Sequence, residues 1–259
     1  MGIKKMKKII LSYGRPYSIK THKLLDRGLD DDYFIAIRES QLDEYSSNNT
    51  IKDGVFITIP DTCNTLAKTK NYVNKIIDDD VLFLDDDIEY FCSAYTKNKN
   101  LTNPDDVHFL LDNVYQNSKD LGIGLYTINQ SANMLYSDLS KPFSFVKLCG
   151  SVCGVNDKDI MFDENLTIRC DADYTIQNLI KHRIILCDNR FAFYSKKDTN
   201  VGGSTSNNRG NKVLADKQYL IDKWGRYIKF SIHNQSRIKG TQGKDQCTIR
   251  VTRKQRGIF

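Results

Sequence analysis

Three consecutive aspartates, Asp85, Asp86 and Asp87, follow directly on the apolar run 81–84. Four apolar residues bounded in this way predict a short buried strand, and in open α/β sheets ligands bind beyond the carboxyl ends of the strands. Adjacent carboxylates repel one another unless a cation neutralises them, and oxygen ligands of this kind suit Mg²⁺ or Mn²⁺. We therefore predict that these acids hold a divalent ion that faces phosphate groups. The alternative is a polar turn that ends the strand.

A second set of candidate residues lies in a stretch rich in Gly, Ser and Asn at residues 199–211. The composition predicts a long loop. The backbone amides of Gly202 and Gly203 and the guanidinium of Arg209 suit phosphate oxygens, so the loop could close over a diphosphate. The alternative is a surface loop with no ligand.

The elements that must position these residues alternate between strands and helices. In the first half, strands are predicted at residues 8–12, 33–37, 55–59 and 81–84, and helices at 18–27 and 62–77. Short strands that alternate with helices predict parallel pairing in a layered α/β sheet.

The second half is less regular but carries one strong helix start. Asn103 is a capping residue, Pro104 takes the first helical position and two acids follow, which predicts a helix to about residue 120. Further strands are predicted at 122–128, 143–148 and 184–187, and further helices at 171–182 and 211–224.

Charge is distributed unevenly along the chain. The 259 residues carry a formal net charge of +6, and residues 223–259 hold ten Lys or Arg against the single acid Asp245. A basic segment on a near-neutral body predicts a polyanionic partner, and nucleic acid is the first candidate. The alternative is a solvated tail that aids solubility. We expect one α/β domain over residues 1–222 and a basic C-terminal extension over 223–259, packed on that domain or trailing from it.

Composition argues against several classes of protein. No apolar run approaches the roughly 18 residues that a membrane span needs, and the apolar stretch 9–11 is too short for a signal peptide. We therefore expect a cytoplasmic protein without a membrane partner. The seven cysteines are odd in number and irregular in spacing, so we expect reduced thiols. Cys149 and Cys153 alone are a weak cue for zinc, because no second pair lies nearby.

The order of these elements resembles the nucleotide-binding half of the GT-A glycosyltransferases, with a turn at Arg15 and Pro16 and an Asp-x-Asp motif after the fourth strand. The fold class implied is α/β, a GT-A type Rossmann-like layered sheet flanked by helices. More narrowly, residues 8–230 are similar to the TET-associated glycosyltransferases of bacteriophages, which are thought to add sugars to hydroxymethylated pyrimidines in DNA. The similarity rests on the segments 11–16 (LSYGRP), 37–45 (IRESQLDEY), 84–88 (LDDDI) and 171–175 (DADYT).

The resemblance implies which residues bind the donor. In GT-A enzymes the Asp-x-Asp motif contacts the nucleotide ribose and the metal, which assigns Asp85 and Asp86 to the nucleotide and Asp87 to the metal. A basic residue on the preceding helix faces the diphosphate in this family, and Lys70 has that place. The alternative for Lys70 is a solvated helix face.

Further roles are implied for residues outside the aspartate run. Arg15 is expected at the nucleotide, and Gln41 and Tyr45 at the nucleobase through an amide hydrogen bond and stacking; the alternative for this pair is an amphipathic helix start. Several GT-A families use a late histidine as an additional metal ligand, which here is His233. The alternative for His233 is a structural side chain.

Two acids open the predicted helix 171–182, and the resemblance implies that one of them is the general base for the acceptor hydroxyl. Asp171 and Asp173 point in different directions because two residues separate them, so only one can reach the acceptor. We expect Asp173 to be that residue. As plain acids in a first helical turn, both are also explained without any function.

The function implied is transfer of a sugar from a nucleoside-diphosphate sugar, with a UDP-sugar as donor and Mn²⁺ or Mg²⁺ as cofactor. The acceptor expected is a hydroxyl on 5-hydroxymethylpyrimidine, or on an already glycosylated base, in phage DNA. One alternative keeps the chemistry but uses a surface polysaccharide or lipid-linked acceptor, although no amphipathic membrane-binding segment is evident. A nucleotidyltransferase is disfavoured because residues 14–16 are too meagre for its glycine-rich loop. A non-catalytic DNA-binding protein with a degenerate site is the remaining alternative.

Overall fold

The computed structural model describes residues 5–52, 54–96, 100–130, 140–195, 209–233 and 244–251. The strands of its central sheet are β1 (Met6–Leu11), β2 (Phe34–Arg38), β3 (Phe56–Ile59), β4 (Asp80–Asp85), β5 (Ile88–Ser93), β6 (Asn100–Leu101), β7 (Leu125–Asn129), β8 (Phe143–Ser144), β9 (Val152–Val155) and β10 (Leu186–Ser195). The helices are α1 (Leu42–Ser46), α2 (Leu66–Ile76), α3 (Pro104–Asp120), α4 (Cys170–His182) and α5 (Arg209–Trp224). A separate hairpin pairs β11 (Ile228–His233) with β12 (Lys244–Ile249).

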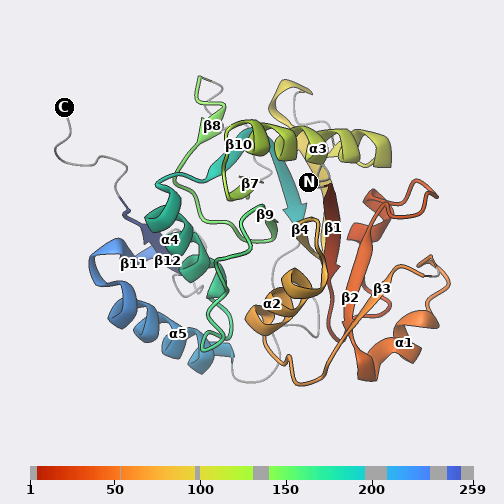
Figure 1. Cartoon of the computed structure of the whole chain (residues 1–259), viewed down its shortest axis with the longest axis horizontal. Helices are drawn as coiled ribbons and strands as arrows, with labels where there is room; N and C mark the ends of the chain where they lie inside the picture. Colours follow the sequence, from red (N-terminus) through yellow and green to blue (C-terminus); the bar gives the residue numbers. More distant parts are fainter. Residues whose placement is uncertain are drawn as a thin grey trace, which may run out of the picture.

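The sheet has the order β3-β2-β1-β4-β9-β7-β10-β5-β6, and β8 pairs with β10 (Figure 1). The first four strands of this order are mutually parallel, as predicted. The apolar runs of β1 and β4 are buried on both faces: Ile9 and Phe83 belong to one core cluster, while Ile10 and Leu82 belong to the other. Burial on both faces explains why these strands read as continuous apolar runs in the sequence.

The helix predicted at residues 18–27 is wrong, because only the 3-10 turn Thr21–Leu24 forms there. The hydroxyl of Thr21 donates to the carbonyl of Asp85 at 2.6 Å and accepts from the amide of Ile88 at 3.0 Å. The amide of Lys20 donates to the carbonyl of Asp86 at 2.8 Å. This segment therefore bonds to the aspartate run instead of continuing a helical ladder.

The second half of the sheet is mixed rather than parallel. Strand β9 is antiparallel to both β4 and β7, and its Gly154 is required because a Cβ there would lie 1.9 Å from Cζ of Tyr126. Strand β10 runs parallel to β7 and then, after an irregularity between Asp188 and Ala192, antiparallel to β5. The strand predicted at 143–148 is only the two-residue β8, and β5, β6 and β9 were not predicted.

Helices α2 to α5 confirm the other predicted helices within a few residues. At α3 the side chain of Asn103 accepts a hydrogen bond from the amide of Asp105 at 2.9 Å, as the capping pattern indicated. Figure 1 shows α4, α5, β11 and β12 gathered on one side of the molecule, opposite β2 and β3. Ile228 and Val251 are buried in the same core cluster as Ile9 and Phe83, so the described part of residues 223–251 packs on the α/β fold. Among the described residues, no helix is long and apolar enough to cross a bilayer.

Candidate active site

The three aspartates lie at the end of β4 and in the turn to β5, and their side chains do not share one environment. Asp86 is buried, with 5% of its surface exposed, whereas Asp85 and Asp87 are half-buried. The run therefore separates into a pair of accessible acids and one acid that faces the protein.

Asp86 holds the loop after β1 against this turn. Its carboxylate accepts hydrogen bonds from Oγ of Ser12 at 2.6 Å and from Nη1 of Arg15 at 3.0 Å. Burial and the charge of Asp85 raise the pKa of Asp86, although these two donors oppose the shift. Each carboxylate oxygen of Asp86 is bound by the protein, which argues against the expected contact of Asp86 with the nucleotide. Arg15 likewise faces Asp86, with 12% of its side chain exposed.

Tyr45 also holds the loop after β1 in place. Its hydroxyl bonds with Oγ of Ser12 at 2.8 Å and accepts from the amide of Arg15 at 3.1 Å, and its ring is 0% exposed. The expectation that Tyr45 stacks on a nucleobase is therefore wrong. Two rings of this loop are exposed, Tyr17 at 67% and Tyr13 at 51%, and Tyr13 lies 5.6 Å from the guanidinium carbon of Arg38. Tyr13 was missed because it reads as an ordinary turn residue.

Gln41 is half-buried at the end of a short 3-10 turn, and its Oε1 accepts from the amide of Gly14 at 3.3 Å. It therefore borders the loop that carries Tyr13, which leaves its predicted place beside the nucleobase open to test.

Asp85 and Asp87 form the part of the site that suits a cation. Burial, followed by the charges of Asp85 and Asp86, raises the pKa of Asp87 to about 6. Two crowded carboxylates with few donors favour a proton or a metal ion, and Mg²⁺ is commonly held by one or two carboxylates together with substrate phosphates and water. Across the described part of the chain, no group of three potential ligands is present. The donor set therefore fits an ion that is completed by phosphate oxygens rather than a closed protein site.

For three of the predicted ligands the structure describes no side chain. Gly203 lies outside the described residues. Arg209 is the first residue of α5 and His233 is the last residue of β11, but their side chains are outside the described part of the chain. Their roles at the diphosphate and the metal stay predictions.

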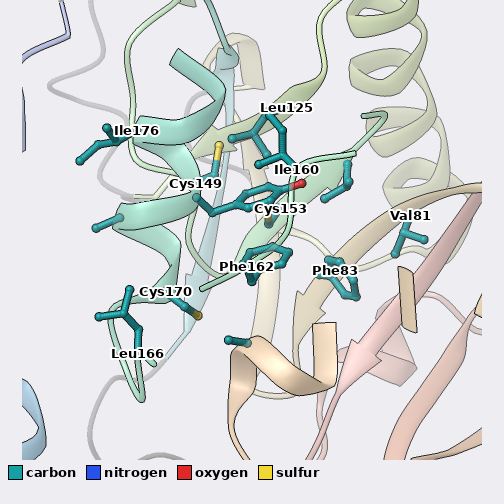
Figure 2. Packing of buried hydrophobic residues seen from close by; sticks show 14 of the residues in the cluster. Val81, Phe83, Leu125, Cys149, Cys153, Ile160, Phe162, Leu166, Cys170 and Ile176 are labelled. Carbon is teal, nitrogen blue, oxygen red and sulfur yellow. The ribbon is translucent and has the colours of Figure 1, made fainter. Parts of the chain in front are cut away.

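Lys70 is not on a solvated helix face, since only 3% of its surface is exposed. Its Nζ lies 4.9 Å from the ring centroid of Phe162 and 5.5 Å from that of Phe83, which adjoin one another in the core (Figure 2). Burial by itself lowers the pKa of Lys70, but neighbouring thiols and the carboxylates of Asp85 and Asp171 outweigh it and raise the pKa. Lys70 is therefore a buried cation that is influenced by both acid clusters.

Of the two acids in α4, the one that we expected to reach the acceptor is the buried one. Asp173 is 0% exposed; its Oδ1 accepts from Nε1 of Trp224 at 2.7 Å and from Nζ of Lys223 at 2.8 Å, and its Oδ2 accepts from Gln177 at 2.5 Å. Asp171 is half-buried and accepts from the amide of Ala172 at 2.8 Å. Burial is the main cause that raises the pKa of Asp171. This geometry contradicts the preference for Asp173, which fastens α5 to α4, and leaves Asp171 as the accessible acid.

Helix α5 also fixes the chain that leads into α4. The carboxylate of Asp216 accepts from the amides of Thr167 at 3.2 Å, Ile168 at 2.7 Å and Arg169 at 2.9 Å. Asp216 is 4% exposed and was missed. The available signal was an acid in helical register with the apolar residues Val213 and Leu220, which lie three residues before it and four after it.

Comparison with known proteins identifies the family. The model of the TET-associated glycosyltransferases matches residues 6–203, which is most of the chain. The chain belongs to the TET-associated glycosyltransferase family. It is accordingly a glycosyltransferase, and the resemblance drawn from its motifs is confirmed. No curated protein matches this family member.

Solved structures show the same architecture. Glucosyl-3-phosphoglycerate synthase from Mycobacterium tuberculosis in complex with Mg²⁺ and UDP matches with a TM-score of 0.51 at 8% identity, over 96% of this chain and 88% of that one. A mycobacterial protein matches with a TM-score of 0.52 at 7% identity, over 95% of this chain and 84% of that one. At these identities the likeness concerns the fold alone, which confirms the GT-A type α/β sheet flanked by helices.

Proposed function

We propose that this TET-associated glycosyltransferase transfers a sugar from a UDP-sugar to a hydroxyl on a modified pyrimidine in DNA. The observation that carries the donor half is the pair Asp85 and Asp87 at the end of β4, where burial and then the neighbouring carboxylates raise the pKa of Asp87 to about 6. The synthase with a similar fold was solved with UDP and either Mg²⁺ or Mn²⁺, which supports the same donor chemistry here. The basic residues of 223–259 support a polyanionic acceptor.

Asp85 and Asp87 would hold a divalent ion, which when bound supplies positive charge beside the diphosphate that leaves. Asp86, Ser12, Arg15 and Tyr45 have a supporting role, because their hydrogen bonds fix the loop that borders the nucleotide. Lys70 adds a buried positive charge between the donor acids and Asp171. Its charge lowers the pKa of Asp171 and so opposes the effect of burial on that carboxyl group.

Asp171 is the proposed general base. As the bond forms between the acceptor oxygen and the anomeric carbon, the bond from that carbon to the diphosphate breaks, and the hydroxyl proton passes to the carboxylate of Asp171. A base in this place is needed for inversion of the anomeric carbon. Retention would not need it there, so the stereochemistry of the product also tests the role of Asp171.

The test is a donor and acceptor screen with the full chain. UDP-sugars are incubated with Mn²⁺ and either hydroxymethylated or unmodified DNA, and the nucleosides are analysed by mass spectrometry. We expect a sugar adduct only on hydroxymethylated DNA, no adduct after EDTA treatment, and none with Asp87→Asn. An adduct on a polysaccharide but on no DNA would favour the alternative acceptor. The absence of transfer, and of any thermal shift with UDP-sugar and Mn²⁺, would favour a non-catalytic DNA-binding protein.

A further inference from the structure

Two tyrosine rings stack on one another in the pair of strands beside the aspartate turn. Tyr90 of β5 and Tyr194 of β10 are opposite each other in the ladder, with ring centroids 5.0 Å apart and 11° between the ring planes. Tyr194 is 37% exposed and Tyr90 is half-buried. Because the inner faces of the two rings cover each other, the exposed surface consists of their outer faces and edges. The pair is therefore a flat aromatic surface that the fold leaves partly open.

The two rings lie on the same face of the sheet as Asp85. Leu84, Phe91 and Phe193 belong to one core cluster, so they point to one side of the sheet. Side chains alternate along a strand, which places Asp85 and the two tyrosines on the opposite side. In the described part of the chain, the apolar cluster on that side of β5 and β10 consists of small side chains, namely Cys92, Ala192 and the partly buried Ala94. The tyrosine rings project above these small side chains.

The stacked pair is also close to the aspartate turn along the chain. Tyr90 comes three residues after Asp87, which limits the separation of their Cα atoms to about 10 Å. In the ladder Ser195 is opposite Ile88, the first residue of β5, so Tyr194 is one residue from the end that meets the turn. A ligand that occupies the site at Asp87 and extends along β5 therefore meets the rings.

The position of the pair favours the acceptor over the donor nucleotide. The loop after β1, which borders the proposed nucleotide site, bonds to Asp86 through Ser12 and Arg15. In the sheet, β1 is next to β4 on one side, whereas β10 and β5 follow β9 and β7 on the other side. The rings are thus on the far side of the aspartate turn from the nucleotide loop, where the molecule that receives the sugar has room.

We propose that Tyr90 and Tyr194 form a stacking platform for a nucleobase of the acceptor strand. Every nucleobase has a π-face that stacks on an aromatic ring, and a substituent at the edge of a pyrimidine leaves that face free. A base inside a duplex cannot offer its face to a side chain, so the platform takes a single strand or a nucleotide turned out of the helix. The proposal rests on the proposed nucleic-acid acceptor, yet binding tests it without catalysis.

The first experiment measures the binding of single-stranded DNA. Fluorescence anisotropy is recorded with a fluorescein-labelled all-thymidine oligonucleotide and with an abasic oligomer of equal length. Wild type should prefer the thymidine probe. Tyr90→Leu and Tyr194→Leu should each bind that probe about fivefold more weakly and the abasic probe unchanged, because only base stacking is lost. The slope of log K against log[salt] should stay the same, because no charge is removed.

Conservative variants and a distant ring serve as controls. Tyr90→Phe and Tyr194→Phe keep the rings and should bind both probes as wild type does. Phe109→Leu removes a ring that is 73% exposed on α3 and should also match wild type. A thermal melt of each variant reports its folding. Equal affinity of wild type for the two probes would overturn the platform even if a leucine variant does not fold, and so would folded leucine variants that keep the preference for thymidine.

The second experiment separates the acceptor base from the donor sugar. The leucine variants should raise the KM for DNA, while the KM for the UDP-sugar, measured by its slow hydrolysis without acceptor, stays unchanged. A raised donor KM with unchanged oligonucleotide binding would overturn the proposal by assigning the rings to the donor sugar. If the preference for thymidine depends on the rings but no DNA is glycosylated, the platform stands and the proposed function fails.

Discussion

The aspartate turn (residues 85–87) and the first turn of α4 each present acids, and the fold treats the members of each group differently. In the turn, Asp86 is bound by Ser12 and Arg15, while its neighbours are half-buried. In α4, Asp173 is bound by Trp224 and Lys223, while Asp171 is half-buried. In both places one carboxylate anchors the structure, and another within two residues of it is half-buried and is proposed to meet a ligand.

The difference lies in the donors rather than in the acids. The anchoring carboxylates accept two or more side-chain hydrogen bonds from residues distant in the chain. Asp87 accepts none from a side chain among the described residues, and the pKa values of Asp87 and Asp171 are raised chiefly by burial. A carboxylate whose pKa is raised by burial gains by meeting a metal ion or a proton.

The largest effect expected is on Asp87. Asp87→Asn should lower kcat/KM for sugar transfer by about 10³-fold or more, because one of the two carboxylates proposed for the metal is lost. The Tm should not fall, since a crowded like charge is removed. Asp86→Asn should instead lower the Tm, because Ser12 and Arg15 lose their charged acceptor. Transfer rates and thermal melts are compared with those of the exposed control Asp106→Asn. If Asp86→Asn and Asp87→Asn lower the Tm equally, the distinction between an anchoring and a ligand-facing carboxylate is wrong.

In α4 the corresponding activity loss is expected at Asp171. Asp171→Asn should lower the rate of transfer by about 10²- to 10³-fold, the usual contribution of a general base, with little change in Tm. Slow hydrolysis of the UDP-sugar measures whether the donor site stays intact. The exposed Asp159→Asn serves as control. If Asp171→Asn transfers sugar at the full rate and still inverts the anomeric carbon, Asp171 is not the general base.

Asp173 should affect stability rather than chemistry. Asp173→Leu leaves the indole N–H of Trp224 without its acceptor, while Lys223 keeps Asp163 and Gln177 keeps the carbonyl of Met161. The loss of these three bonds to a buried carboxylate should cost about 3 kcal/mol. For a chain of this size that corresponds to a Tm lower by roughly 6–12 °C. The activity that remains below the melting range should be close to wild type. A stable variant that is inactive would restore the general-base role to Asp173.

The sequence located the aspartate turn correctly at the end of a strand but chose the buried acid of α4, and the reason is physical. Strands β1, β2 and β4 are short apolar runs buried on both faces, so their order and the place of the aspartate turn follow from local patterns. The helix start at Asn103 is likewise local. The choice between Asp171 and Asp173 depends on Trp224 and Lys223, which come from the end of α5. No periodicity within α4 carries that information.

The strands that were missed have the same cause. Residues 88–93 (IEYFCS) and 152–155 (VCGV) mix polar, aromatic and small side chains, and they are strands because β10, β4 and β7 offer them edges. Tyr45 is similar: its spacing suits a helix start, but only the fold shows that its hydroxyl meets Ser12 and the amide of Arg15. Contacts between distant segments, rather than local propensity, determine the structure at these positions.

The pH dependence should report the aspartate turn. Because the pKa of Asp87 is raised to about 6, transfer should decline about tenfold per pH unit below that value as the carboxylate protonates. Metal ions compete with protons for the same oxygens, so more Mn²⁺ should move this acid limb to lower pH. The measurement is kcat/KM against pH at two Mn²⁺ concentrations. A limb that does not move with Mn²⁺ would point to another group.

The same shift has a defined sign for stability. The pKa of Asp87 in the folded protein lies above its unfolded value of about 3.9, so the folded protein holds the extra proton between roughly pH 4 and 6. The stability from this proton is present at low pH and is lost as the pH rises through about 6. Without metal, the Tm advantage of Asp87→Asn over wild type should therefore be larger at neutral pH than in acid.

The smallest effect expected concerns Tyr45, and it separates a supporting ring from a ligand-binding one. Tyr45→Phe removes the hydroxyl that bonds to Ser12 and to the amide of Arg15, which should cost about 1 kcal/mol and lower the Tm by roughly 2–4 °C. The donor KM should rise a few-fold while kcat stays unchanged, because only the positioning of the loop is weakened. Tyr17→Phe, which loses an exposed bond to Ser47, is the matched control.

The exposed ring should behave in the opposite way. Tyr13 is 51% exposed beside Arg38, so Tyr13→Ala should raise the donor KM without lowering the Tm if its ring borders the nucleobase. A nucleobase that stacked on Tyr45 would tolerate Tyr45→Phe, because phenylalanine keeps the ring, and both its donor KM and its Tm would match wild type. That result, together with an unaffected Tyr13→Ala, would mean that the hydroxyl of Tyr45 does not hold this loop. The division between anchoring and ligand-facing side chains would then fail around β1, although it could still hold in α4.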